Sequence, residues 1–331
     1  MITIDNIKEE QIEFFNQLEK LSSSPKSFIA EISDLLNIAR TAVYARRNGT
    51  VFISIYEQAL LNEHFAKFYR KKFFSHYTRK VRFEVSSISK HYTVHKWLSD
   101  TLQLLTPIAK DPDAHIYYTG ANLHLFYNFS TPKLAAFYIY WLHKYILQSP
   151  EYQLLPFSWK RMVQTEEVKL ATQIWKKYQE ISSTEIWTRY ILITTLDKIK
   201  EMRRDKFFES DKEYKALSED IIEIMALLDQ QAELGHKIDN IHAKYSLFSL
   251  ESKHESNCAI IKYGHSSSFF DLLNNRTIMM TTDKDFCEAQ LREFKQKIKN
   301  SKPLSSTNRT ERTRILSEYR AELMKAIVSA N

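Results

Sequence analysis

A short stretch near the N-terminus carries side chains that could hydrogen-bond to the edges of nucleobases. Arg40, Tyr44 and Arg47 recur at i, i+4 and i+7, so a helix would place them on one outward face with Thr41 at its border. Arginine can donate two parallel hydrogen bonds to guanine in the major groove, and a threonine hydroxyl can bond several base edges. Arg46 flanks this face, where a guanidinium would bind a backbone phosphate. The residue types and their spacing predict a helix that reads double-stranded DNA.

Two helices joined by a tight corner would have to position these side chains. Residues 28–36 (FIAEISDLL) have apolar side chains at helical spacing. Asn37 follows, and asparagine is one of the few residues besides glycine that tolerates a left-handed corner. Residues 39–48 then form the second helix, and Gly49 is well placed to end it.

This segment resembles the helix-turn-helix of Cro/CI-type (XRE-type) bacterial transcriptional regulators. The resemblance rests on the stretch ISDLLNIARTAVYARRNGT, residues 32–50, and on the YEQALL that follows it. Asn37 stands where that family usually has glycine, and Ala39 stands where a Ser or Thr often caps the recognition helix. The resemblance implies a sequence-specific regulator that inserts residues 39–48 into the major groove. We expect a homodimer, because paired half-sites supply the specificity that one small domain lacks.

Positive charge is concentrated in the same part of the chain. Residues 25–82 contain 11 lysines and arginines and 4 aspartates and glutamates, a net +7 that equals the formal charge of the whole chain. Within it, residues 67–82 (KFYRKKFFSHYTRKVR) mix basic and aromatic side chains and contain no acid. Arg70, Lys71 and Lys72 are therefore candidate phosphate contacts. The alternative is a linker helix whose aromatic side chains pack on a core while its lysines reach the solvent.

Length and composition indicate two domains and a helix-rich fold. The chain has 331 residues but only 4 glycines and 7 prolines, fewer than parallel α/β folds or β-sandwiches normally use at turns. We therefore predict a mainly α fold, α+β overall. An all-α helix-turn-helix domain with a basic linker helix would occupy residues 1–78. A helix-rich regulatory or dimerisation domain with a small antiparallel β element would occupy residues 79–331.

Periodicity and end signals predict the elements of the second domain. Residues 115–121 (HIYYTGA) indicate a short strand, and Pro132 suits the start of a helix. The run STEIWTRYILITTLDKIKEMRRDKFF begins with a Ser-Thr-Glu start signal and predicts one long helix. EYKALSEDIIEIMALLDQQAEL has helical periodicity and ends at Gly235. Beyond Asn240, the segments YSLFSLES, NCAIIKY and TIMMTT indicate the small antiparallel sheet.

The order of several phrases is similar to that in a group of bacterial single-chain regulators with a helix-turn-helix and a long C-terminal region. The phrases are HIYYTGANLHLFYNFSTPKLAAF, STEIW, QQAELGHK and TTDKDFC, spread over most of residues 115–290. The resemblance implies a role in transcription, and it assigns no functional residue to this region.

The chain has no recognisable catalytic signature. It lacks GxSxG, HExxH, P-loop and GxGxxG patterns. His91 and His95 could share a helix face and bind a metal, but no carboxylate or cysteine nearby completes a site. Cys258 and Cys287 form no CxxC pair. We expect no enzyme activity, no catalytic residue, no metal and no cofactor. The aromatic patch from residue 117 to 145 predicts either a ligand pocket or a well-packed core.

No secretory signal opens the chain, and the most membrane-like run, residues 134–147, is too short and polar to span a bilayer. We therefore expect a cytoplasmic protein without a membrane partner. Its expected partners are double-stranded DNA, a second copy of itself, and an unknown small-molecule or protein effector. The alternative function is a protein–protein interaction module that uses the helical hairpin and the basic stretch without reading a DNA sequence.

Overall fold

The computed structural model describes residues 4–22, 25–73, 81–120, 122–251, 257–273, 277–305 and 309–328. The chain divides into two compact units, Met1–Lys80 and Val81–Asn331. The sequence-based boundary lies two residues earlier, between residues 78 and 79. Among the described helices, none combines the length and the apolar character needed to cross a membrane.

The described residues of the first unit form four helices. They are α1 (Ile4–Glu19), α2 (Pro25–Leu36), α3 (Arg40–Arg47) and α4 (Ile55–Phe73). The helix α3 packs against α1 and α2, and α4 packs against α2. The small hydrophobic core of the first unit is formed by Phe15, Leu18, Phe28, Ile29, Ile32, Val43, Leu61 and Phe65. Because α3 contributes only Val43 to this core, most of its surface is left for other contacts.

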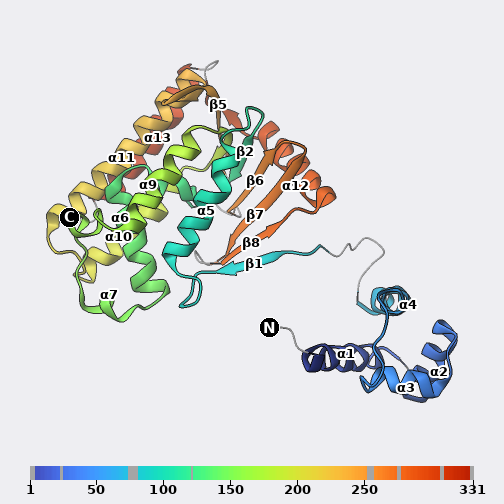
Figure 1. The fold of residues 1–331 in the computed structure, drawn as a ribbon. Helices are drawn as coiled ribbons and strands as arrows, with labels where there is room; N and C mark the ends of the chain where they lie inside the picture. Colours follow the sequence, from blue (N-terminus) through green and yellow to red (C-terminus); the bar gives the residue numbers. More distant parts are fainter. Residues whose placement is uncertain are drawn as a thin grey trace. The chain divides into compact units, whose positions relative to one another are not determined.

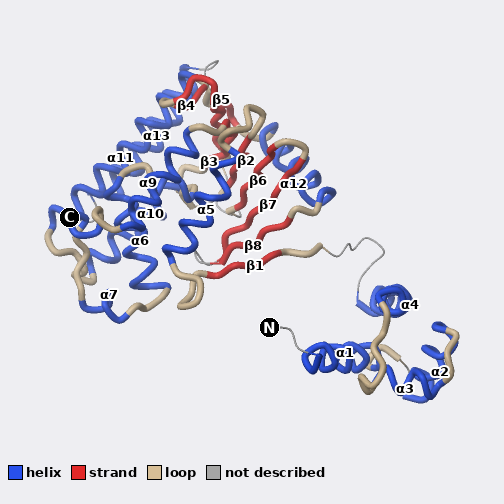
Figure 2. Tube along the Cα trace, in the orientation of Figure 1, coloured by secondary structure: helices blue, strands red, loops and turns tan. Residues whose placement is uncertain are grey.

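The second unit is organised around one mixed sheet of nine strands (Figure 2). The strand order is β1-β8-β7-β6-β2-β3-β5-β4, and β9 pairs with β5. The pairs β2–β3 and β3–β5 are parallel, and the other pairs are antiparallel. The strands are β1 (Glu84–Ser87), β2 (His115–Thr119), β3 (Ser182–Trp187), β4 (His236–Lys237), β5 (Asn240–Ser249), β6 (Cys258–Tyr263), β7 (Ser266–Leu273), β8 (Thr277–Thr281) and β9 (Lys302–Pro303).

Helices cover both faces of this sheet (Figure 1). The connections between the parallel strands are helical, as parallel pairing requires. The helices are α5 (Val94–Ile108), η1 (Leu125–Phe129), α6 (Pro132–Trp141), the π-helix η2 (Leu142–Ile146), α7 (Pro150–Leu154), α8 (Trp159–Met162), α9 (Glu166–Gln179), α10 (Ile191–Arg204), α11 (Asp211–Leu234), α12 (Lys284–Lys299) and α13 (Arg309–Val328). The helix α12 packs on β2, β6 and β7 and closes a small core with Ile260, Phe269 and Phe294. The main core lies on the opposite face, where α5, α6, α9, α10, α11 and α13 contribute side chains.

The predicted fold class is wrong. The sheet is large and mixed, so the protein is α/β rather than mainly α with a small β element. The largest single error concerns β3, which occupies Ser182–Trp187, where the sequence predicted the start of a long helix. From its second residue onward this strand is buried on both faces, so apolar and polar residues do not alternate along it as they do in a half-exposed strand. Its Ser-Thr-Glu run also resembles the start signal of a helix. The low glycine content was also a poor argument against an α/β fold, because the helical connections between the parallel strands need few tight turns.

Several local predictions are confirmed. Pro132 is the first residue of α6, and the predicted strand at residues 115–121 is β2. The helix α11 ends at Gly235, whose φ of 73° lies in the left-handed region that glycine adopts without a steric cost.

Candidate DNA-binding surface and a buried ion-pair cluster

The corner between α2 and α3 has the geometry predicted for Asn37. Its φ is 52°, so the backbone turns in the left-handed region. The N–H of Ile38 donates to the carbonyl of Ser33 at 3.1 Å, and the N–H of Asn37 donates to Asp34 at 3.4 Å. These two bonds form a Schellman motif, which satisfies carbonyls at the end of α2. The hydroxyl of Ser33 also donates to the Ile38 carbonyl at 2.6 Å. The direction of α3 is therefore set by a fully bonded turn.

The end of α3 is held in the same way at Gly49. Its φ is 69°, the N–H of Thr50 donates to Ala45 at 2.9 Å, and the N–H of Gly49 donates to Arg46 at 3.0 Å. The predicted role of Gly49 at the helix end is confirmed. A Cβ at this position would lie 2.5 Å from Cγ of Lys8, so a larger residue would also meet α1.

A buried glutamine of α1, missed in the sequence, ties the end of α3 to the loop after it. Gln11 Nε2 donates to the carbonyls of Arg46 at 2.6 Å and Val51 at 2.9 Å. Its Oε1 accepts from the N–H of Ile53 at 3.0 Å. Gln11 falls at i, i+4 and i+7 with the core residues Phe15 and Leu18, so a polar side chain on the apolar face of α1 was the available signal. Gln11 therefore holds α1 against the end of α3 through one backbone contact and against the following loop through two.

The structure separates the predicted DNA contacts into two groups. Arg40, Thr41 and Tyr44 are exposed on the outer face of α3, and Tyr44 keeps 47% of its surface exposed. The N-terminus of α3 has no side-chain cap at Ala39. In its first turn the N–H of Ala42 donates to the Ala39 carbonyl at 2.9 Å, and the N-terminus of a helix favours acceptors such as a phosphate.

The other two arginines of α3 form ion pairs within the unit. Arg46 donates to Glu57 Oε1 from Nη2 at 2.9 Å and from Nε at 3.1 Å, and Glu57 also accepts from the N–H of Ser54. The pKa of Glu57 is lowered because these donors outweigh its partial burial. Arg47 Nη2 lies 2.6 Å from Glu19 Oε2. The two guanidinium groups therefore link α3 to α4 and to α1.

The remaining basic candidates are described only in part. Arg70, Lys71 and Lys72 belong to α4, but their side chains lie outside the described residues, as do residues 74–80. The unit Met1–Lys80 carries 12 lysines and arginines and 9 aspartates and glutamates, because α1 adds acids that the window 25–82 leaves out. The whole unit therefore has a net charge of only +3, and its basic residues are concentrated in α3 and α4.

Two oppositely charged side chains lie inside the second unit with no exposed surface. Glu185 of β3 and Lys237 of β4 are both 0% exposed, and Lys237 Nζ lies 3.5 Å from Glu185 Oε1. The carboxylate accepts from Trp187 Nε1 at 2.8 Å, from Ser183 Oγ at 3.0 Å and from the hydroxyl of Tyr178. Residues 183, 185 and 187 share one face of β3 because strand side chains alternate. The strand itself therefore supplies two of the donors.

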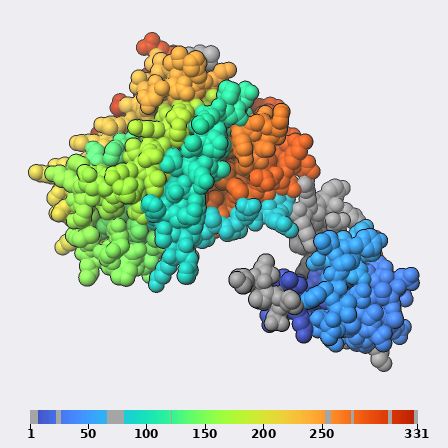
Figure 3. Space-filling view, viewed as in Figure 1, coloured from blue at the N-terminus to red at the C-terminus, as the bar shows by residue number. Residues whose placement is uncertain are grey.

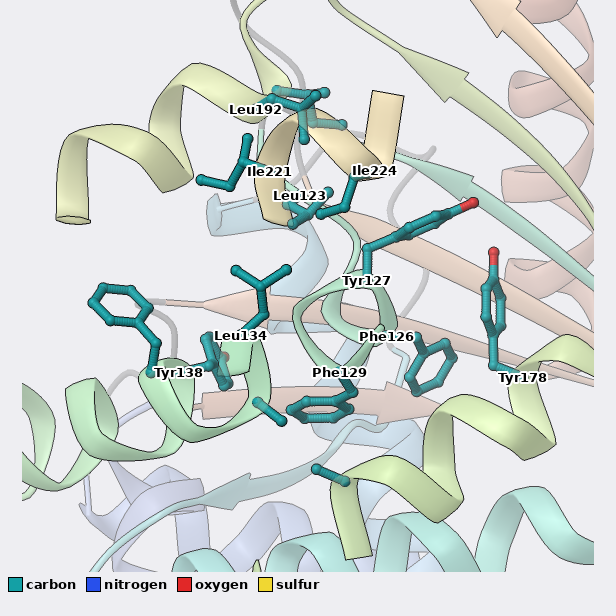
Figure 4. Packing of buried hydrophobic residues seen from close by; sticks show 14 of the residues in the cluster. Leu123, Phe126, Tyr127, Phe129, Leu134, Tyr138, Tyr178, Leu192, Ile221 and Ile224 are labelled. Atoms are coloured by element: carbon teal, nitrogen blue, oxygen red, sulfur yellow. The ribbon is translucent and has the colours of Figure 1, made fainter. Parts of the chain in front are cut away.

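Two more tyrosines complete this cluster. The hydroxyls of Tyr127 on η1 and Tyr245 on β5 each lie 3.3 Å from a Glu185 oxygen and 3.3 Å from one another. Figure 4 shows the hydroxyl groups of Tyr127 and Tyr178 turned toward one another. Lys237 Nζ lies 3.9 Å from the centre of the Tyr178 ring and 4.5 Å from that of Tyr245. Three phenols thus surround one ion pair.

Burial and neighbouring charges have opposing effects on the pKa values of the groups in this cluster. Burial alone would raise the pKa of Glu185, but Lys237, His124 and the hydrogen-bond donors lower it. Burial lowers the pKa of Lys237 to about 8, against the opposing effect of Glu185. The pKa of His124, which stacks on Tyr178 at 5.3 Å, falls to about 4 because it is buried. At neutral pH the cluster therefore holds a carboxylate, an ammonium group and a neutral imidazole.

Three of the phrases that carry the broader sequence resemblance meet in this cluster. The phrase HIYYTGANLHLFYNFS contains Tyr127, STEIW contains Glu185, and QQAELGHK contains Lys237. No role was predicted for these three residues from the sequence. A glutamate between β-prone residues and a lysine just after a helix-ending glycine were the available signals. Because both charged groups are closed to solvent, the ion pair fixes β3 and β4 relative to the helices around them.

The histidines and cysteines that the sequence offered as candidates form no site together. His91 precedes α5, which begins at Val94, so His91 and His95 do not form the i, i+4 pair of one helix. Cys258 and Cys287 are not joined by a disulfide.

No protein-family model and no curated protein matches the chain. Among solved structures, it matches TrmBL2, an archaeal chromatin protein whose structure shows a novel mode of DNA binding. The two share 9% sequence identity, and the match covers 88% of this chain and 80% of that chain with a TM-score of 0.26. A TM-score of this size does not indicate a shared fold.

Proposed function

We propose that the first unit is a sequence-specific DNA-binding domain of a transcriptional regulator, with α3 in the major groove. The observation that carries this proposal is the exposed face of α3, where Arg40, Thr41 and Tyr44 lie. One Schellman motif ends α2 just before this helix, and a second ends α3 itself. A helix that reads bases must be rigid and must present free donors. The helix-turn-helix assignment and the Cro/CI-type resemblance belong to this proposal.

Arg46 and Arg47 have a different role in this proposal from the one that the sequence predicted. Their ion pairs with Glu57 and Glu19 make them positioning residues for α3. Base contacts then fall to Arg40, Thr41 and Tyr44. The second unit would support regulation by dimerising or by binding an effector, rather than by catalysing a reaction.

The test is selection from a random pool of double-stranded DNA at two salt concentrations. Wild-type protein should enrich one motif, and Arg40→Ala should lose it while retaining weak, salt-sensitive binding. One bidentate contact to a base contributes about 1–3 kcal/mol, or roughly 5- to 150-fold in affinity. Lys20→Ala removes the same charge from an exposed site outside α3 and should leave the motif intact. The proposal is wrong if wild type enriches no motif, or if both variants lose affinity equally.

A specific observation favours a second candidate, a protein-docking surface. Four apolar side chains between α3 and the start of α4 are largely exposed: Val51 at 44%, Phe52 at 47%, Ile55 at 88% and Tyr56 at 71%. Such a group is typical of a protein interface. Under this alternative, Ile55→Asp would abolish partner binding, whereas Arg40→Ala would not. If the DNA selection fails, this candidate replaces the first.

A further inference from the structure

The second unit contains a cavity of about 510 Å³ between the main-core face of the sheet and the helices that cover it. This volume lies within the range of small-molecule sites. In Figure 3 the teal surface of α5 adjoins the orange surface of β6–β8, over which the cavity extends. Leu104 of α5, which is 38% exposed, and the exposed Glu84 of β1 both line it. The cavity therefore opens to solvent beside α5 and β1.

The strand register explains the shape of the cavity. Directly paired residues of neighbouring antiparallel strands share a face of the sheet. One such row crosses five strands and forms the floor: Glu84, Met280, Phe270, Ala259 and Tyr118. Ala259 is the smallest residue of this row. Trp97, Leu105 and Phe126 of the covering helices form the walls. The lining is thus predominantly apolar, and the cavity is deepest over the small side chain of Ala259.

Three nitrogen donors of the lining have no acceptor within the described part of the chain. Lys198 of α10 forms no ion pair or hydrogen bond there, and its Nζ lies 4.5 Å from the Trp141 ring. His124 is 3% exposed, and its Nδ1 accepts from the N–H of Phe126, which leaves the hydrogen of the neutral ring on Nε2. That Nε2 is buried without a partner, and so is Nε1 of Trp97.

The acidic groups of the lining do not satisfy these donors. Asp100 is already bonded to Lys96 Nζ at 2.6 Å and to the hydroxyl of Tyr92 at 3.1 Å. Glu84 is exposed on the edge strand. Asp271 follows Phe270 in β7 and pairs with Met279. Because side chains alternate along a strand, the Asp271 side chain points to the face of the sheet away from the cavity. The cavity thus has unmatched donors, and a buried donor without an acceptor costs free energy.

We propose that this cavity binds an apolar small molecule that carries one carboxylate, with Lys198 as the counter-ion and His124 and Trp97 as further hydrogen-bond donors. The apolar lining would take the hydrocarbon or aromatic body of the ligand. The carboxylate would supply acceptors to donors that the protein leaves unmatched. This inference concerns the second unit and stands independently of DNA binding by the first.

The test uses dodecanoate as the probe and 1-dodecanol as its uncharged counterpart, titrated into the full-length protein by calorimetry. Wild type should bind dodecanoate at one site and at least tenfold more tightly than dodecanol. Tryptophan fluorescence should change on binding, because Trp97 lines the cavity. Lys198→Met should lose at least tenfold in dodecanoate affinity and keep its dodecanol affinity. Lys200→Met, on the same helix but outside the lining, should behave as wild type.

A second variant tests the location of the site. Ala259→Leu places a larger side chain on the cavity floor and should weaken binding of both probes, with circular dichroism confirming that the variant is folded. The proposal is overturned if wild type binds neither probe, if the two probes bind equally, or if Lys198→Met retains dodecanoate affinity. Unchanged binding in folded Ala259→Leu would place the ligand elsewhere and would also overturn it.

Discussion

The buried pair of Glu185 and Lys237 permits a double-mutant cycle whose outcome follows from the structure. Both side chains are fully buried, so removing either one leaves the other charge without its counter-ion in a medium of low polarity. Breaking a buried ion pair in this way typically lowers the free energy of unfolding by about 3–5 kcal/mol. We expect Glu185→Leu and Lys237→Met each to fall in this range.

The two single variants should differ in a definite order. In Lys237→Met, the remaining carboxylate keeps the donors of Ser183, Trp187 and Tyr178. In Glu185→Leu, those same donors lose their acceptor together with Lys237. Glu185→Leu should therefore be the more destabilising change. The double variant removes both charges, so its cost should be about 1–3 kcal/mol less than the sum of the two single costs.

Urea unfolding followed by tryptophan fluorescence is the suitable assay. All five tryptophans lie between residues 97 and 187, so the signal comes from the second unit alone. The lysine of the exposed pair Lys169–Glu166 offers a control, since Lys169→Met should leave the urea midpoint close to the wild-type value. Single costs that add within about 0.5 kcal/mol would refute the reasoning, because they would show that the two charges are not coupled.

Three further predictions concern backbone geometry and pH. Because φ is 52° at Asn37, Asn37→Gly should preserve or slightly raise the stability of the first unit, whereas Asn37→Val should lower it by about 1–2 kcal/mol. Far-ultraviolet circular dichroism during thermal unfolding measures the stability of both variants. Equal effects of the two substitutions would contradict the prediction. Gly235→Ala, at a φ of 73° with open space around the added carbon, should cost about 1 kcal/mol in urea unfolding; an unchanged midpoint would show that the strain is relieved. Burial lowers the pKa of His124 to about 4, below the usual 6.5, so the unfolded chain binds a proton that the folded unit excludes between these values. His124 should therefore contribute a fall of up to about 1.4 kcal/mol per pH unit in the free energy of unfolding as pH drops from 6.5 to 4. His124→Leu should reduce the measured slope, and an identical slope in both proteins would disprove the assignment.

Local backbone features could be predicted from the sequence alone. The corner at Asn37, the helix ends at Gly49 and Gly235, and the helix start at Pro132 all match the structure. Each depends on the conformations that one residue type can adopt, whatever the distant parts of the chain do. The exposed face of α3 followed in the same way, because helical spacing decides which side chains share a side.

The tertiary structure decided which charged groups remain available. Arg46 and Arg47 look equivalent to Arg40 in the sequence, but Glu57 and Glu19 engage them and leave Arg40 exposed. These partners lie 11 and 28 residues away, so no local pattern signals the pairing. Electrostatic pairing depends on distance in space, which only the packing of the helices defines.

The sheet and its interior were also beyond the sequence. The run SSTEIW suits a helix start as well as a strand, and only its position between β2 and β5, with both faces covered, makes it β3. Glu185 and Lys237 become a pair because β4 joins the sheet beside β5. The cavity above Ala259 likewise depends on the register of five strands. Burial and cavity shape arise from contacts between distant segments, so they are properties of the assembled fold and not of any single stretch of residues.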